Sequence, residues 1–335
     1  MARFVVAAIG VLTLAAGGSA AGERAGRIAF ARDPGSQYEL FTVAPDGSNP
    51  RRLTHNRVED REPRWSPEGR RLLSFGSSGI VIRDARGKVL RRLPRTLLGL
   101  EARWSPDGRQ VAYLEFACDD PTGKGDPLCA HLWVVRLAGP ARRRLVRANV
   151  DTTQHTDRRF AWAPDGGRLV YSAYAPSALV VADVAGGAKR VLRGTRGADQ
   201  PSWSPDGRLI AFLRQKAPFG GDDIYVVAAD GSGLRPLVRS RSDLKAPTWS
   251  PDGRRIAYFR FLGAKAGEER WAVVVADADG DRPRRLGVTG TWDWLDWAPD
   301  SEGVLWTDYD AVFVARADGG GRPRLLGRGD APDWG

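Results

Sequence analysis

A short motif that recurs six times constrains this chain more than any other feature. Each copy combines a tryptophan, a Pro-Asp-Gly-like turn and an apolar segment, as in PSWSPDGRLIAFL and PTWSPDGRRIAYF. The six tryptophans are separated by 39, 58, 41, 46 and 48 residues, and they are Trp65, Trp104, Trp162, Trp203, Trp249 and Trp297. A period of about 40–50 residues with several strands per unit is typical of β-propeller blades.

Each unit predicts four short strands. The tryptophan ends a first strand, and its ring is large enough to fill the space between adjacent blades. Proline, aspartate and glycine favour the tight turn that follows. Residues 209–212 and 224–227 illustrate the second and third strands, and residues 284–286 the short fourth strand. No long amphipathic helix is indicated, so we expect an all-β propeller.

The two ends of the chain complete the pattern. Residues 27–30 begin a unit at its second strand, with no tryptophan turn before them. The final segment DAPDW, residues 330–334, is similar to KAPTW at residues 245–249. We therefore predict seven blades, with the C-terminal strand pairing with the N-terminal blade. Six blades are the alternative, because residues 65–103 have a short loop and a poor third strand.

These motifs resemble the TolB-like β-propeller repeats, relatives of the WD-repeat class that occur in exported bacterial proteins. The resemblance covers nearly all of residues 27–335 and implies a binding or scaffolding role. TolB itself has an α/β domain before its propeller, whereas these repeats begin close to residue 22. We therefore do not expect this chain to be TolB itself.

The N-terminus predicts export. Residues 4–16 are apolar, and Ser19 and Ala21 suit the −3 and −1 positions of a signal-peptidase site. We expect a signal peptide over residues 1–21 and one propeller domain over residues 22–335, with no later membrane span. The protein would reside in the periplasm, the cell envelope or outside the cell. An uncleaved anchor is the alternative, although the run is shorter than the roughly 20 residues of a spanning helix.

Two cysteines, Cys118 and Cys129, lie close together in the sequence. In an exported protein such a pair usually forms a disulfide, and this is our prediction. Two free thiols, or half of a metal site, are the alternatives. A zinc site needs more nitrogen or sulfur ligands, and only His131 is near.

The net charge of +11 comes largely from arginine spread along the whole chain. A solvated surface explains it, and attraction to an anionic polymer or membrane surface is the alternative. The basic residues form no tail or block, so we expect no nucleic-acid partner. We also expect a monomer.

Catalytic motifs are missing from the sequence. The string nearest to a Gly-x-Ser-x-Gly elbow, residues 76–79, lacks its spacing, and the three histidines form no close pair. We therefore predict no catalytic residues, no metal and no cofactor. An enzyme of the polysaccharide lyase or hydrolase type, with its site at the mouth of the central channel, is the alternative function.

The loops after the second and fourth strands vary in length and lie on one face of the predicted propeller. Variable loops on a rigid scaffold commonly carry binding sites. We expect a protein or a cell-envelope polymer to bind there. The candidate residues mix aromatic and basic side chains, and they are His131, Trp133, Lys216, Phe219, Phe261 and Lys265. The alternative is that these side chains pack beneath their own loops.

Overall fold

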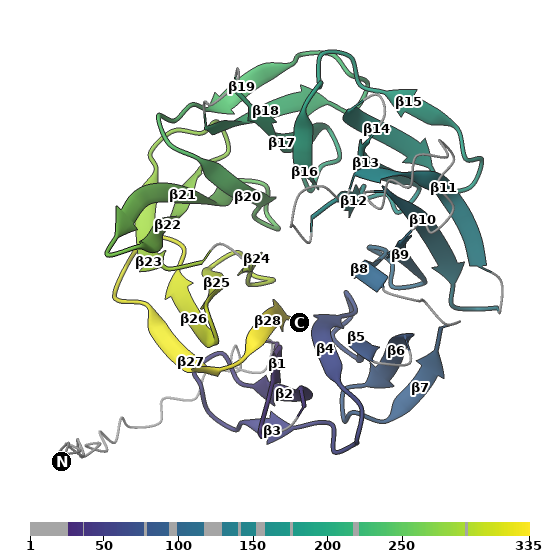
Figure 1. The fold of residues 1–335 in the computed structure, drawn as a ribbon, viewed down its shortest axis with the longest axis vertical. Coiled ribbons are helices and arrows are strands. Elements are labelled where there is room, and N and C mark those ends of the chain that lie inside the picture. The colour runs from purple at the N-terminus through teal and green to yellow at the C-terminus, as the bar shows by residue number, and fades with distance from the viewer. Residues whose placement is uncertain are drawn as a thin grey trace.

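A computed structural model of the protein shows a closed ring of seven four-stranded antiparallel blades around a central channel (Figure 1). The structure describes residues 26–35, 37–76, 79–93, 99–116, 129–139, 142–151, 158–174, 177–216, 221–291 and 294–335. This part of the chain forms strands and turns without a helix, and hence none of it has the long apolar helix that a membrane span requires. Six blades are excluded, because residues 60–92 form a complete blade.

Each of the first three blades contains four strands, ordered from the innermost strand outwards. Blade 1 contains β28 (Asp330–Trp334), β1 (Ile28–Arg32), β2 (Glu39–Val43) and β3 (Arg51–Arg52). Blade 2 contains β4 (Asp60–Trp65), β5 (Arg71–Gly76), β6 (Gly79–Asp84) and β7 (Val89–Arg92). Blade 3 contains β8 (Gly99–Trp104), β9 (Gln110–Phe116), β10 (Cys129–Arg136) and β11 (Arg142–Asp151).

The other four blades follow the same order. Blade 4 contains β12 (Phe160–Trp162), β13 (Arg168–Ala173), β14 (Ala178–Asp183) and β15 (Lys189–Val191). Blade 5 contains β16 (Ala198–Trp203), β17 (Leu209–Gln215), β18 (Asp222–Ala228) and β19 (Arg235–Val238). Blade 6 contains β20 (Leu244–Trp249), β21 (Arg255–Lys265), β22 (Glu268–Asp277) and β23 (Arg284–Thr289). Blade 7 contains β24 (Leu295–Trp297), β25 (Gly303–Asp308), β26 (Ala311–Arg316) and β27 (Arg324–Arg328).

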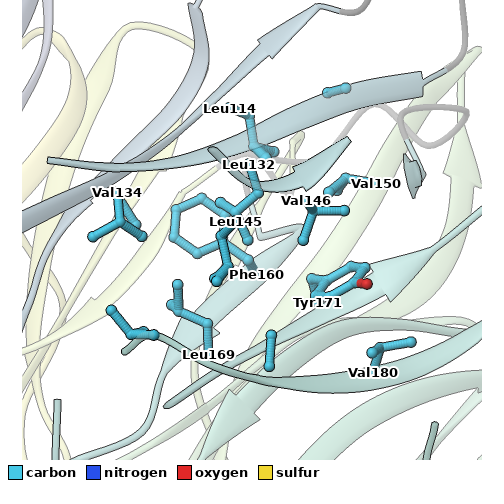
Figure 2. Packing of buried hydrophobic residues seen from close by; sticks show 14 of the residues in the cluster. Leu114, Leu132, Val134, Leu145, Val146, Val150, Phe160, Leu169, Tyr171 and Val180 are labelled. Carbon is cyan, nitrogen blue, oxygen red and sulfur yellow. The ribbon is translucent and has the colours of Figure 1, made fainter. Parts of the chain in front are cut away.

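Apolar side chains fill each junction between blades, because both faces of a blade are covered by its neighbours. Figure 2 shows the cluster between blades 3 and 4, where Leu132 and Val146 pack with Phe160 and Tyr171. A single pair, Val150 with Ala173, also joins β11 to β13, so that blades 3 and 4 share one sheet. Burial of such side chains stabilises the fold by about 1.5–3 kcal/mol each.

The Pro-Asp-Gly turns adopt the geometry that their residues favour. In blade 5, the Ser204 carbonyl accepts a hydrogen bond from the Gly207 N–H (2.9 Å), and the Asp206 carboxylate accepts one from the Arg208 N–H (3.0 Å). Gly207 has a φ of 70°, a backbone conformation that residues with a Cβ atom rarely adopt. These turns lie at the ends of the inner strands, so the opposite face of the ring carries the longer connections.

Ring closure is confirmed. Strand β28 pairs antiparallel with β1, with Ile28 opposite Trp334 and Ala31 opposite Asp330. The Trp334 ring packs against the cluster between blades 7 and 1, which contains Ile28 and Phe30. The N-terminal blade therefore takes its innermost strand from the C-terminus, which lies beside the channel in Figure 1.

We predict that deletion of residues 329–335 destabilises the whole ring. The deletion removes a complete strand and the Trp334 side chain, and loss of a core tryptophan alone typically costs about 3–5 kcal/mol. Thermal unfolding followed by circular dichroism should show a large fall in Tm. Leu325→Ala, on the exposed outer strand β27, is the control and should change Tm little, because Leu325 is 56% exposed. Equal melting of the truncated and full-length proteins would contradict the closure.

Candidate functional site

One position of the repeat supplies the wall of the central channel. The tryptophan at the end of each inner strand packs between blades, and the residue before it points the other way, because side chains alternate along a strand. These preceding residues all line a cavity of about 260 Å³, and they are Arg64, Arg103, Ala161, Ser202, Thr248, Asp296 and Asp333. At this position, blades 7, 1, 2 and 3 therefore contribute charged side chains to the channel wall, whereas blades 4, 5 and 6 contribute small, uncharged ones.

Hydrogen bonds between blades hold this position in place. The indole N–H of Trp104 donates to the Arg64 carbonyl (2.9 Å), and that of Trp162 to the Arg103 carbonyl (3.3 Å). The Trp297 indole donates to the Thr248 carbonyl (3.0 Å) in the same way. Each of these tryptophans thus anchors the channel-lining residue of the preceding blade.

Two carboxylates stand on adjacent inner strands of the channel. Asp333 accepts a hydrogen bond from the Trp65 N–H (2.6 Å), and Asp296 accepts one from the Trp297 N–H (2.9 Å). Burial raises the pKa of Asp333 to about 7, and the negative charge of Asp296 contributes in the same direction. Burial also raises the pKa of Asp296, although the nearby Arg158 opposes this shift. The pair therefore favours holding a proton near neutral pH.

Arginines surround this pair. The Arg64 guanidinium lies 4.0 Å from Asp333 and 3.8 Å from the centre of the Trp294 ring. Arg103 forms an ion pair with Glu101 (2.6 Å), whose other oxygen accepts the Arg159 N–H (2.9 Å). Both guanidinium groups are thus oriented by neighbouring side chains.

Arg158 crosses the channel. It comes from the connection before β12, and its guanidinium donates to the Thr248 hydroxyl of blade 6 and to the Leu295 carbonyl of blade 7. Burial and the neighbouring Arg103 lower the pKa of Arg158 to about 10. Arg158 lines the same cavity as Ala161 and Ser202, whose side chains are small.

The channel can therefore bind or release a proton, and it presents both carboxylate and guanidinium groups to a small ligand. Its guanidinium groups suit carboxylates, which they can contact through two N–H groups at once. Within the described ranges, the side chains form no group of three or more His, Cys, Asp or Glu residues that could hold a metal ion.

The structure distributes the sequence-predicted binding residues over three blades. His131 and Trp133 lie together on β10 with an edge-to-face ring contact, and Arg142 stacks over Trp133 at 4.2 Å. His131 is buried and Trp133 is half-buried.

The remaining predicted residues differ in exposure. Lys216 of blade 5 forms an ion pair with Asp223 (3.0 Å). Phe261 of blade 6 packs against Trp271, with ring centres 5.0 Å apart, whereas Lys265 is exposed at the tip of the same hairpin. Phe219, Cys118 and residues 1–21 lie outside the described residues, as does the side chain of Cys129. The disulfide and the binding role of these residues stay predictions.

Sequence reasoning did not identify the channel residues. An alignment of the repeats on their tryptophans would have revealed them. The residue before each tryptophan is Arg, Arg, Ala, Ser, Thr, Asp and Asp, in chain order. The alignment does not reveal Arg158, because this residue lies in the connection before β12 and outside the aligned position.

Comparison with known proteins agrees with this architecture. A family model described as the TolB beta propeller domain matches residues 80–311, which is more than half of the chain. No curated protein matches the chain in sequence.

Several solved structures share the fold. TolB from Acinetobacter baumannii has a TM-score of 0.56 at 17% identity, covering 92% of this chain and 66% of its own length, slightly less than two thirds. The putative TolB from Agrobacterium tumefaciens has a TM-score of 0.56 at 20% identity, covering 82% of this chain and 95% of its own. An oligogalacturonate lyase in complex with manganese has a TM-score of 0.63 at 16% identity, covering 90% and 85%. At these identities, the likeness shows the fold alone.

We predict that the carboxylate pair makes stability depend on pH. The pKa of an unfolded aspartate is about 3.9, so between there and about 7 the folded protein binds more protons at Asp333 than the unfolded chain does. The contribution of Asp333 to stability is therefore full below the lower value and is lost as pH rises through about 7. Asp333→Asn keeps an oxygen acceptor for the Trp65 N–H and should flatten the fall in Tm between pH 5 and pH 8.

Asp206→Asn is the matched control for this measurement. Hydrogen bonds from Ser204 and the Arg208 N–H lower the pKa of Asp206, so it titrates below that window. The control should keep the wild-type slope. An unchanged slope in Asp333→Asn would show that the pair does not titrate there.

Proposed function

The chain belongs to the TolB beta propeller domain family, and from this premise we propose that it is an exported binding or scaffold protein. Its partner, a protein or a cell-envelope polymer, binds the loop-rich face. We define this face as the side of the ring that carries the connections after the second and fourth strands of each blade. The observation that carries the proposal is the exposure of large side chains in the hairpins that extend on this face.

Three blades present such side chains. Tyr174 and Tyr309 lie at the connections after the second strands of blades 4 and 7, and they are 36% and 59% exposed. Leu262 lies within the long second strand of blade 6, β21, at the irregularity between Phe261 and Gly263, and it is 37% exposed. The other exposed large apolar side chains of the described residues lie on outer strands. The stereotyped turns of the opposite face, where described, therefore lack them. Exposed aromatic and aliphatic groups of this kind commonly anchor a partner.

The loop-rich face is also held in place before any partner arrives. In blade 7, the Asp308 carboxylate accepts hydrogen bonds from the Gly290 N–H (2.7 Å) and the Thr289 hydroxyl (3.1 Å). In blade 2, the Arg61 guanidinium stacks on Tyr38 of blade 1 at 3.9 Å. A preorganised surface loses less conformational freedom on binding, which favours affinity.

We predict that Leu262→Ser combined with Tyr309→Ser abolishes partner capture. The double variant removes exposed apolar anchors, and loss of a hot-spot side chain can cost 2 kcal/mol or more, or about a thirtyfold change in affinity. The measurement is a pull-down from the native envelope fraction with tagged wild-type and variant proteins of equal Tm.

The matched control lies on the opposite face. Asp230→Asn combined with Asp318→Asn changes two exposed hairpin turns and should leave capture intact. Partners that are lost only with this control, and kept with the loop-rich face variant, would refute the assignment of the face.

A second candidate function is an enzyme with its site in the channel. The specific observation that favours it is the Asp296–Asp333 pair, because a carboxyl group with a pKa near 7 suits general acid–base catalysis. The adjacent Arg64 and Arg103 could neutralise an acidic substrate. The fold likeness to an oligogalacturonate lyase suggests an oligouronate as the substrate class.

Turnover of oligogalacturonate distinguishes the two candidates. If the chain is an enzyme of this type, the wild type should form unsaturated product, detected by its ultraviolet absorbance. Asp333→Asn should lower the rate of product formation by a factor of at least about 100. The binding proposal expects no product from the wild type. Asp206→Asn is the control, because it changes a carboxylate outside the channel.

A further inference from the structure

The outermost strand of every blade is basic. Each of β3, β7, β11, β15, β19, β23 and β27 contains Arg or Lys, and Asp151 at the end of β11 is the one acidic residue in these strand sequences. These strands form the circumference of the ring in Figure 1. We call their exposed basic side chains the basic rim, which includes Arg51, Arg144, Arg190, Arg235, Arg284 and Arg324.

Several arginines of the outer strands are oriented without being neutralised. Arg91 donates to the Leu137 carbonyl (2.7 Å), Arg143 to the Val184 carbonyl (2.9 Å) and Arg324 to the Pro45 carbonyl (2.6 Å). In each case the acceptor belongs to the next blade of the ring. Because a backbone carbonyl carries no net charge, these contacts hold the guanidinium in position without neutralising it, although Arg324 also interacts electrostatically with the Asp46 carboxylate. Among the described residues, ion pairs join Arg52 to Glu39 (3.0 Å) and Arg328 to Asp310 (3.3 Å). Arg190 also interacts electrostatically with Asp230 at the edge of the rim.

Protection of the strand edges does not by itself explain this pattern. Exposed edges invite pairing with other chains, and charged side chains prevent it. Charge of either sign serves that purpose, whereas the outer strands carry basic residues with the single exception of Asp151. The outer strands thus contain 15 of the 51 basic residues of the chain and only one acidic residue.

We propose that the basic rim binds a flexible acidic polysaccharide. Guanidinium groups suit the carboxylates of uronic-acid units, which they can contact through paired N–H groups. The rim curves around the whole ring, so a flexible chain can follow several blades. This inference concerns a different surface from the loop-rich face and does not rest on the function proposed above.

Other polyanions fit the rim less well. A planar membrane touches few blades of a convex wall at once. Duplex DNA is stiff over about 50 nm. Single-stranded nucleic acids are held by exposed aromatic side chains, but the exposed large side chains on the described outer strands are aliphatic, as at Leu90 and Leu325.

The test compares two variants that lose equal charge. The rim variant carries Arg51→Gln, Arg190→Gln, Arg235→Gln and Arg284→Gln. The control variant carries changes in the exposed turns after inner strands, namely Arg70→Gln, Arg109→Gln, Arg208→Gln and Arg254→Gln. Binding of the full chain to immobilised alginate, a uronic-acid polymer, is measured at several salt concentrations.

We expect wild-type affinity to fall steeply with salt. The rim variant should bind at least about tenfold more weakly and with a smaller salt dependence, because fewer counterions are released. The control variant should lose less than about threefold, a loss attributable to the lower net charge alone. Both variants should keep the wild-type Tm.

Three outcomes would overturn the proposal. The first is an equal loss of affinity in both variants, which would mean that net charge alone acts. The second is equally tight binding to uncharged dextran. The third is tighter binding to duplex DNA or to anionic phospholipid vesicles, with the same dependence on the rim, which would assign the rim to a different polyanion.

Discussion

Tryptophan packing between blades near the axis is the interaction on which the rest of this structure depends. Every inner strand ends in a tryptophan that belongs to the apolar cluster shared with the preceding blade, as Trp104 and Trp203 illustrate. Because side chains alternate along a strand, packing the tryptophan between blades turns its predecessor toward the channel. One repeated position thus holds the ring together, and the position beside it determines the chemistry of the channel.

Most of the fold was predictable because the same local chemistry recurs in every blade. Tryptophan, proline, aspartate and glycine indicated the inner strand and its turn, and the DAPDW end indicated ring closure. One feature depends on tertiary contacts and was not predicted. The residue before proline normally adopts an extended conformation, yet Gln200 and Ala246 have positive φ values of 52° and 53°. The Gln200 side chain accepts the Ala246 N–H (2.6 Å), so a contact between blades favours this conformation.

The candidate site was less predictable than the fold, because its charges meet only across blades. Asp333 and Arg64 are far apart in sequence, and closure of the ring makes them neighbours. In the long hairpin of blade 6, the sequence does not distinguish a packed side chain from an exposed one. Phe261 packs on Trp271, while Leu262, the next residue, is exposed. A difference of one position along a strand reverses the side chain's direction, and composition carries no information about it.

Desolvation explains why charged residues are arranged differently on the innermost and outermost strands of a blade. An ionised group in the enclosed channel loses water, so it must find a partner there, as Asp333 does with the Trp65 N–H and Arg158 with the Leu295 carbonyl. On the outer strands, arginine remains hydrated, and an unpaired charge costs little. Basic residues that seem dispersed in the sequence can therefore accumulate on the circumference, since each repeat contributes some at the same place. The channel charges are therefore held at a cost in desolvation, which shifts the pKa values of Asp333, Asp296 and Arg158 toward their uncharged forms, whereas the charges of the outer strands remain exposed to solvent.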